Sequence, residues 1–279
     1  MGVAFFLNGQ AGTILFKRRD YYENERKKVL GLVLAGVFAA GSLTACSGGG
    51  SNRATEAATA EKAADNAEAA EGESAAADTT EAAGGEKKTL RVAMECAYAP
   101  YNWTQPDDAN GAVPIADSNE FAYGYDVMMA KKIADTLGYD LEIVRLDWDS
   151  LIPAVTTEQV DCVIAGQSIT SERLQAVDFT EPYYYATIVT LVKEGSKYEN
   201  AASVADLAGA TCTSQQSTIW YNTCLPQIEG ANILAATASA PDMLMSLNAD
   251  KCDLVVTDQP TGKGALVAYP NFKMLEFEG

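Results

Sequence analysis

The charged side chain best suited to binding chemistry is Arg173, which follows the string Ala165-Gly-Gln-Ser-Ile-Thr170. A guanidinium grips a carboxylate through two parallel hydrogen bonds, each roughly twice as strong as a bond between neutral groups. An isolated arginine after a strand is more often half of a surface ion pair. The preceding string favours a carboxylate site, because Gly166 lets the backbone approach a ligand closely.

Composition narrows the possible functions. The chain has no histidine, the commonest general base and metal ligand, so a hydrolase or a metalloenzyme is disfavoured. Its formal net charge of −18 makes nucleic acid and anionic lipid poor electrostatic partners. Composition therefore disfavours an enzyme, and we expect no cofactor; we also expect a monomer.

The elements that position Arg173 lie in an α/β pattern that begins at about residue 89. Short apolar runs suited to a buried parallel sheet alternate with segments of helical spacing. Asp126 is a candidate N-cap for the first helix, and Gly138 ends it. Up to residue 185 we expect strands at 90–94, 141–146 and 160–165, and helices at 126–137 and 150–157.

A second α/β unit follows the turn at Pro182. An extended apolar segment at 186–192 leads to a strand at 210–214, a helix at 241–248 and a strand at 253–257. Two sheets joined by a crossing segment predict two lobes with a cleft between them, where small-ligand sites are favoured.

The N-terminal region has the order of a secretory signal peptide. Three basic residues at 26–28 precede the apolar run 29–40 and a stretch of small residues. The run is shorter than the roughly 20 apolar residues of a membrane-spanning helix. We assign residues 1–45 to a signal-peptide region, and the first ~25 residues, which do not fit it, to a start site placed too far upstream.

The string Leu43-Thr-Ala-Cys46 resembles the lipobox of bacterial lipoproteins. That resemblance implies acylation of Cys46, with palmitate among the candidate chains, and a lipid anchor in the cell membrane outside the cytoplasm. Residues 46–88 are mostly Ala, Glu, Gly, Ser and Thr, so they predict a disordered tether.

Seven strings in the folded region resemble the family 3 extracellular solute-binding proteins, which bind polar amino acids for ABC importers. The resemblance implies a type II periplasmic-binding-protein fold, with lobe one at 89–185 and lobe two at 186–279. It also implies that the chain captures a polar amino acid, with a cationic one among the candidates, and delivers it to membrane permease subunits. The strings lie at residues 90–101, 124–127, 148–154, 161–173, 177–183, 206–209 and 253–258.

The same resemblance assigns residues to the ends of a zwitterionic ligand, whose two charges need partners once water is excluded. Ala165 and Gly166 would present backbone groups, and Ser168 and Thr170 would place hydroxyls near the ligand. Asp258 in lobe two would bind the ammonium group. The alternatives remain an ordinary turn capped by Ser168 and a solvated aspartate at 258.

Other residues would surround the ligand side chain or complete the carboxylate site. Tyr98 and Trp148 would flank the side chain, although both could be core residues. Glu95 would meet a polar or cationic end. Thr218 matches the threonine of a Gly-Thr pair that helps to hold the carboxylate, but Ser217 replaces the glycine.

Three further questions stay open. Family members return to lobe one through a second crossing strand and a final helix, so ending at Gly279 predicts a C-terminally truncated chain with an incomplete lobe one. A sensor component of a signalling receptor and, less favoured, a dehydratase-like enzyme are alternative functions. The cysteines after Cys46 allow pairs at 96/162 or 212/252, or buried free thiols.

Overall fold

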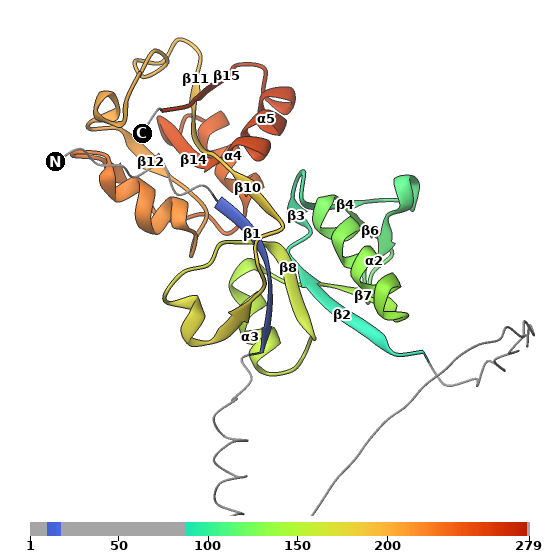
Figure 1. The fold of residues 1–279 in the computed structure, drawn as a ribbon. Helices are drawn as coiled ribbons and strands as arrows, with labels where there is room; N and C mark the ends of the chain where they lie inside the picture. Colours follow the sequence, from blue (N-terminus) through green and yellow to red (C-terminus); the bar gives the residue numbers. More distant parts are fainter. Residues whose placement is uncertain (1–9, 18–86, 278–279) are drawn as a thin grey trace, which may run out of the picture. The chain divides into compact units, whose positions relative to one another are not determined.

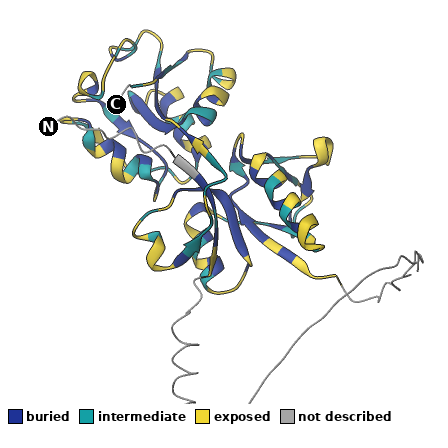
Figure 2. Cartoon of the chain, in the orientation of Figure 1, coloured by how far each residue is buried: buried dark blue, intermediate teal, exposed yellow. Residues whose placement is uncertain are grey.

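The computed structural model describes residues 10–17 and 87–277. These residues form two α/β lobes joined by extended segments (Figure 1). The strands run through the interior of each lobe and the helices cover them, so that burial is concentrated in the sheets (Figure 2). The predicted two-lobed α/β class is confirmed.

Lobe one is built on a mixed sheet with the strand order β10-β1-β8-β2-β7, in which β9 also pairs with β1. Strands β2, β7 and β8 are parallel, as their continuous apolar runs predict. Helix α2 packs on one face and the short helix α3 on the other. The elements are β1 Gln10–Lys17, β2 Thr89–Met94, α2 Tyr125–Leu137, β7 Asp140–Arg145, α3 Leu151–Thr156, β8 Cys162–Gln167, β9 Val177–Phe179 and β10 Tyr184–Ala186.

A small antiparallel sheet extends lobe one between β2 and α2. Its order is β3-β4-β6-β5, and no pattern in the sequence predicted it. Its strands are too short to show a clear period of two in the sequence. They are β3 Ala97–Tyr98, β4 Asn102–Gln105, β5 Val113–Pro114 and β6 Phe121–Tyr123.

Lobe two contains a five-stranded sheet with the order β13-β12-β14-β11-β15. The predicted strands and the helix at 241–248 are present, whereas strand β13, helix α5 and strand β15 were not predicted. The elements are β11 Ile188–Lys193, β12 Thr211–Thr213, β13 Asn232–Ile233, α4 Ala240–Asn248, β14 Leu254–Asp258, α5 Gln259–Ala268 and β15 Phe272–Leu275.

The prediction that Asp126 caps α2 is wrong. Gly124 occupies the N-cap position, and Asp126 lies inside the helix with a fully buried side chain. Its carboxylate accepts hydrogen bonds from Asn102 Nδ2 (2.7 Å) and Tyr183 Oη (2.6 Å). Burial raises the pKa of Asp126 to about 6. The carboxylate therefore ties α2 to β4 and to the segment before β10.

All cysteines of the described residues are free thiols, so neither candidate disulfide is formed there. The five side chains are buried, and burial raises the pKa of Cys96, Cys162, Cys224 and Cys252 to about 12. Cys46 lies outside the described residues.

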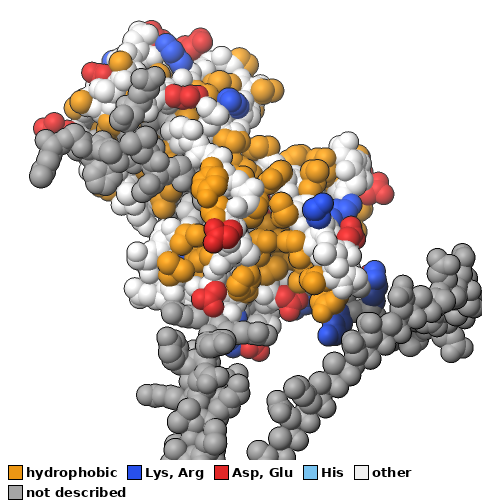
Figure 3. Space-filling view, in the orientation of Figure 1, with side chains coloured by type: hydrophobic (Ala, Val, Ile, Leu, Met, Phe, Trp, Pro, Cys, Tyr) orange, Lys and Arg blue, Asp and Glu red, His pale blue; other side chains and the backbone are white. Residues whose placement is uncertain are grey.

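Strand β1 comes from the region that the sequence analysis assigned to a signal peptide. It lies between β8 on one side and β9 and β10 on the other. Hydrophobic side chains gather on the face of the molecule that carries β1 and β10 (Figure 3). Phe16 and Tyr185 from these strands, and Tyr125 from α2, are among the exposed large hydrophobic residues.

Candidate functional site

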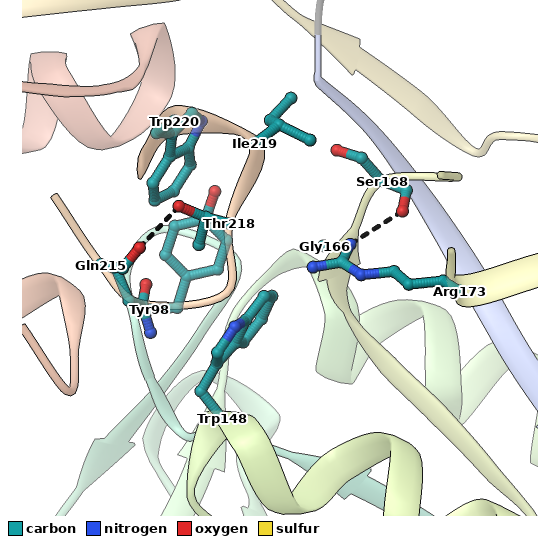
Figure 4. A pocket seen from close by; sticks show the side chains of 9 residues that line it. All are labelled: Tyr98, Trp148, Gly166, Ser168, Arg173, Gln215, Thr218, Ile219 and Trp220. Atoms are coloured by element: carbon teal, nitrogen blue, oxygen red, sulfur yellow. Dashed lines mark hydrogen bonds between the residues drawn. The ribbon is translucent and has the colours of Figure 1, made fainter. Parts of the chain in front are cut away.

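A pocket between the two lobes brings together several of the predicted residues (Figure 4). Lobe one supplies the end of β8, the loop after it, the turn before α3 and the ring of Tyr98. Lobe two supplies the loop that follows β12. The lining residues are Tyr98, Trp148, Gly166, Ser168, Arg173, Gln215, Thr218, Ile219 and Trp220.

Gly166 is required at the floor of this pocket by both its backbone and its neighbours. Its φ of +63° lies in the left-handed region that disfavours a side chain. A Cβ there would lie 2.6 Å from Tyr184 Oη and 2.9 Å from Tyr98 Cε1. The absence of a side chain lets these two rings approach the end of β8.

Arg173 projects into the pocket and spans the two lobes. Its Nη1 donates to the carbonyl of Ser168 (2.8 Å), and its Nη2 donates to the carbonyl of Ser217 in lobe two (2.8 Å). The guanidinium carbon lies 5.7 Å from the centre of the Trp148 ring, within cation–π range. None of the ion pairs among the described residues includes Arg173.

Burial lowers the pKa of Arg173 to about 10, so the guanidinium stays charged at neutral pH. Thr170 holds the backbone of Arg173 in position, because the Thr170 Oγ1 accepts a hydrogen bond from the Arg173 backbone N–H (3.1 Å). A charged, partly buried guanidinium bonded to two neutral carbonyls can bind an anion such as a carboxylate.

The loop after β12 in lobe two has an uncommon backbone conformation at Ser217, the residue that replaces the glycine of the Gly-Thr pair. Ser217 has a φ of +55°, the region that glycine adopts most easily. Thr218 Oγ1 donates to the carbonyl of Gln215 (2.7 Å) and accepts from the backbone N–H of Tyr221 (3.2 Å). The loop thus keeps a glycine-like bend while its carbonyl at 217 points to Arg173.

Asp258 lies behind Tyr98 instead of on the pocket wall. Its side chain is fully buried and caps α5, accepting from the backbone N–H of Thr261 (3.0 Å). The hydroxyls of Tyr98 and Tyr101 also donate to it. Burial raises the pKa of Asp258, while these hydrogen bonds lower it.

Glu95 occupies a neighbouring cavity that shares Trp148 with the pocket. Gln215 Nε2 in lobe two donates to Glu95 Oε1 (2.9 Å). Burial raises the pKa of Glu95 to about 7, opposed by this bond and assisted by the carboxylates of Asp147 and Asp242. The cavity is also lined by Asp147, Asp242 and Arg145, and Arg145 is paired with Glu120 (2.6 Å). Its three carboxylates outnumber its one cation, so the cavity favours a cationic group.

The structure therefore divides the predicted residues into four groups. Tyr98, Trp148, Gly166, Ser168, Arg173 and Thr218 line one pocket. Glu95 lines the adjoining cavity, whereas Asp258 and Thr170 support residues of the pocket. Ala165 is fully buried in the core of lobe one and does not line the pocket.

Sequence reasoning missed Gln215, Ile219 and Trp220 as lining residues. All three follow β12, in or beside the string Ser214-Gln-Gln-Ser-Thr218. An apolar pair directly after a hydroxyl-rich loop was the available signal. The pocket itself admits little more than a water molecule, so a larger ligand requires the two lobes to separate.

The described residues contain no group of three or more His, Cys, Asp or Glu side chains that could hold a metal ion. Within residues 10–17 and 87–277, no helix is both long and apolar enough to cross a membrane.

A two-lobed α/β fold with a narrow charged pocket between the lobes defines a ligand-binding protein of the type II periplasmic-binding class. The chain belongs to the bacterial extracellular solute-binding proteins, family 3, whose family model matches residues 90–250.

Individual relatives are similar over part of their length. A probable histidine-binding protein of Campylobacter jejuni is 29% identical over 182 residues, which are 65% of this chain and 64% of the relative. The arginine-binding extracellular protein ArtP of Bacillus subtilis is 32% identical over 133 residues, 48% of this chain and 46% of ArtP. This chain therefore spans about half to two thirds of these relatives.

Solved structures show the same fold. An amino acid ABC transporter substrate-binding protein from Streptococcus pneumoniae, bound to L-arginine, matches with a TM-score of 0.60 and 27% identity, over 68% of this chain and 75% of that one. The holo form of ArgBP from T. maritima matches with a TM-score of 0.57 and 27% identity, over 68% and 77% of the two chains.

Proposed function

We propose that this chain is the extracytoplasmic substrate-binding component of an ABC importer, and that it binds an amino acid with a cationic side chain. The observation that carries the proposal is the guanidinium of Arg173, which is charged, partly buried and, among residues 10–17 and 87–277, hydrogen-bonded to one backbone carbonyl from each lobe. A ligand carboxylate would replace these carbonyls with a bidentate, charge-assisted partner.

The cavity that contains Glu95, next to the Arg173 pocket, is the reason for proposing a ligand with a cationic side chain. A side chain that passes along Trp148 would leave the Arg173 pocket and enter the cavity of Glu95. Apolar methylenes pack well on an aromatic ring, and the Glu95 carboxylate would pair with the terminal charge. The names of the relatives, which include arginine- and histidine-binding proteins, agree with such a ligand.

Binding would be coupled to closure of the lobes. Arg173 and Glu95 belong to lobe one, whereas Ser217 and Gln215 belong to lobe two. A ligand that contacts both sets stabilises the closed arrangement, because these contacts are lost when the lobes separate.

A thermal-unfolding screen of the chain with the twenty amino acids tests the proposal. At a concentration of 100 Kd, a ligand stabilises the folded state by about 2.7 kcal/mol, which raises Tm by roughly 5–10 °C. We expect this rise with arginine, lysine or histidine, and its loss in Arg173→Ala.

Arg91→Ala is the matched control, because Arg91 pairs with Glu142 on an exposed surface. It should leave the ligand response unchanged. A response to neutral or acidic amino acids alone would contradict the cationic ligand, and no response to any amino acid would contradict the binding function.

Attachment to the membrane is a separate part of the proposal. Cys46 would carry the lipid anchor, and residues 46–88 would act as the tether. Incorporation of a labelled palmitate analogue into the chain, lost in Cys46→Ser, is the expected result. Labelling that persists in Cys46→Ser would contradict this site.

A further inference from the structure

Glu95 is a buried carboxyl group whose hydrogen-bond donor is neutral. The residue is 7% exposed, and none of the ion pairs among residues 10–17 and 87–277 includes it. The carboxamide of Gln215, from the opposite lobe, donates to it. A buried charge that faces a neutral amide is costly. The closed site is therefore stabilised when either a proton or a ligand cation neutralises Glu95.

The acidic groups around Glu95 act in the same direction. Burial is the main cause that raises the pKa of Glu95 to about 7, and the carboxylates of Asp147, Asp242 and Asp149 add to it. Asp147 and Asp149 lie between β7 and α3 in lobe one, whereas Asp242 lies in the first turn of α4 in lobe two. Carboxylates from both lobes therefore disfavour a negative charge on Glu95.

The other titratable groups beside Glu95 do not neutralise it. Arg145 lines the cavity but is paired with Glu120 (2.6 Å). The thiol of Cys96 stays neutral, because burial raises its pKa to about 12. The charge that would balance an ionised Glu95 must then come from a ligand.

The carboxamide of Gln215, which lies on the lobe-two side of the pocket (Figure 4), decides which oxygen of Glu95 meets a ligand. Its Nε2 donates to Glu95 Oε1 (2.9 Å) and to the carbonyl of Ala238 (3.4 Å). The backbone of Gln215 is held in place by a parallel bridge to Thr237. Because Oε1 accepts an N–H, the proton of a neutral Glu95 belongs on Oε2. This oxygen accepts hydrogen bonds when Glu95 is ionised and donates one when it is protonated.

We propose that the cavity of Glu95 takes two classes of ligand side chain: a guanidinium or ammonium group when Glu95 is ionised, and a neutral ureido or carboxamide group when Glu95 is protonated. In the first complex the carboxylate pairs with the ligand cation. In the second, Glu95 takes one proton from the solvent, and Oε2–H donates to the carbonyl oxygen of the ligand side chain. This inference rests on the proposed function, because Arg173 binds the ligand carboxylate in both complexes.

The two complexes respond differently to pH. The complex with a neutral side chain holds one proton more, so it is favoured at low pH. The ratio of the two Kd values depends only on the protons bound in the two complexes, and not on how far the lobes open without a ligand. Between the pKa values of Glu95 in the two complexes, the preference for the cation should rise by up to about tenfold per pH unit.

Arginine and citrulline are the matched probes, because they have the same length and the ureido oxygen of citrulline replaces a guanidinium nitrogen. Calorimetric titration of the full chain from about pH 5.5 to about pH 8 should show the citrulline-to-arginine ratio of Kd rising by roughly tenfold or more. In buffers of different ionisation enthalpy, citrulline should take up more protons than arginine.

A constant ratio, or a failure of citrulline to bind at the low-pH end where arginine binds, would overturn the inference and leave the proposed function intact. Binding of neither probe at any pH would overturn it as well. The proposed binding function itself fails only if no amino acid binds.

Three variants assign the effect to Glu95. Glu95→Gln should bind arginine at least about tenfold more weakly near pH 8, and its ratio should no longer depend on pH. Gln215→Leu removes a donor that lowers the pKa of Glu95, so the change in ratio should move to higher pH, which a purely structural role would not cause. Asp126→Asn, a buried carboxylate of raised pKa outside the pocket lining, is the control and should keep the wild-type dependence. An unchanged dependence in Glu95→Gln would overturn the proposal.

Discussion

Arg173 of lobe one and Ser217 of lobe two are joined by a hydrogen bond of 2.8 Å from Nη2 to the backbone carbonyl. The acceptor belongs to a residue with a φ of +55°, so an uncommon backbone conformation turns this carbonyl toward the guanidinium. The pair joins the two lobes directly at the pocket. A bound carboxylate would compete for the same donor.

This relationship predicts the effect of Arg173→Lys. Lysine keeps the positive charge but lacks the planar fork, so one of two charged hydrogen bonds to a carboxylate is lost. We expect the Kd for the ligand found in the screen to rise about 10-fold, equivalent to about 1.4 kcal/mol. Isothermal titration calorimetry measures the change, and Arg91→Lys is the control. An unchanged Kd would show that Arg173 does not bind the carboxylate.

A second prediction concerns Asp258→Asn. Asparagine is also a good N-cap, so the start of α5 should survive and Tm should fall by only a few degrees. Ligand affinity should fall, because the ring of Tyr98 on the pocket wall would lose the charged acceptor that holds its hydroxyl.

Asp126→Asn is the matched control for Asp258→Asn, because Asp126 is an equally buried carboxylate with two side-chain donors but lies away from the pocket. It should lower Tm without changing the Kd. Equal affinity of Asp258→Asn and the wild type would assign Asp258 a structural role alone.

Glu95 predicts a pH dependence of stability. Burial raises its pKa in the folded state to about 7, whereas the unfolded value is near 4.5. Between these values the folded state binds more protons than the unfolded state, so stability falls as pH rises from about 4.5 to about 7. The full effect of such a shift is on the order of 3 kcal/mol.

Denaturant unfolding of the wild type and Glu95→Gln at several pH values tests this sign. Asp126 and Asp258 also have raised pKa values, so they contribute to the fall of stability with rising pH in both proteins. Glu95→Gln should lose stability less steeply across the interval. A cationic ligand should bind more tightly as pH rises through about 7, because it favours ionised Glu95. Identical slopes in the two proteins would contradict the assignment.

A comparison of Gly166→Ala with Gly195→Ala separates the cost of a left-handed backbone from the cost of side-chain crowding. Gly166→Ala places a methyl group against Tyr184 and Tyr98 at a φ of +63°. Gly195→Ala meets the same kind of strain at a φ of +77°, but nothing lies within 4 Å of its Cβ. Gly195→Ala should cost roughly 1–2 kcal/mol, whereas Gly166→Ala should cost more and should also weaken ligand binding. Equal effects of the two changes on Tm and Kd would show that the rings are not a constraint.

The two-lobed α/β class and the pocket residues of lobe one could be predicted from the amino-acid sequence. Continuous apolar strands and a glycine- and hydroxyl-rich segment before Arg173 are local features, and local sequence records them directly. It did not reveal that Asp126 is a buried anchor for Asn102 and Tyr183, because those partners lie 24 and 57 residues away.

The contacts between distant segments became visible in the folded chain alone. Residues 10–17 form a strand inside a sheet whose other members begin at residue 89, and no local pattern encodes that pairing. The same holds for Gln215 and Glu95, which are 120 residues apart and share a hydrogen bond. Secondary structure follows from side-chain periodicity along one segment. Strand order and the composition of the pocket follow from which segments can bury one another, and this depends on the whole folded chain.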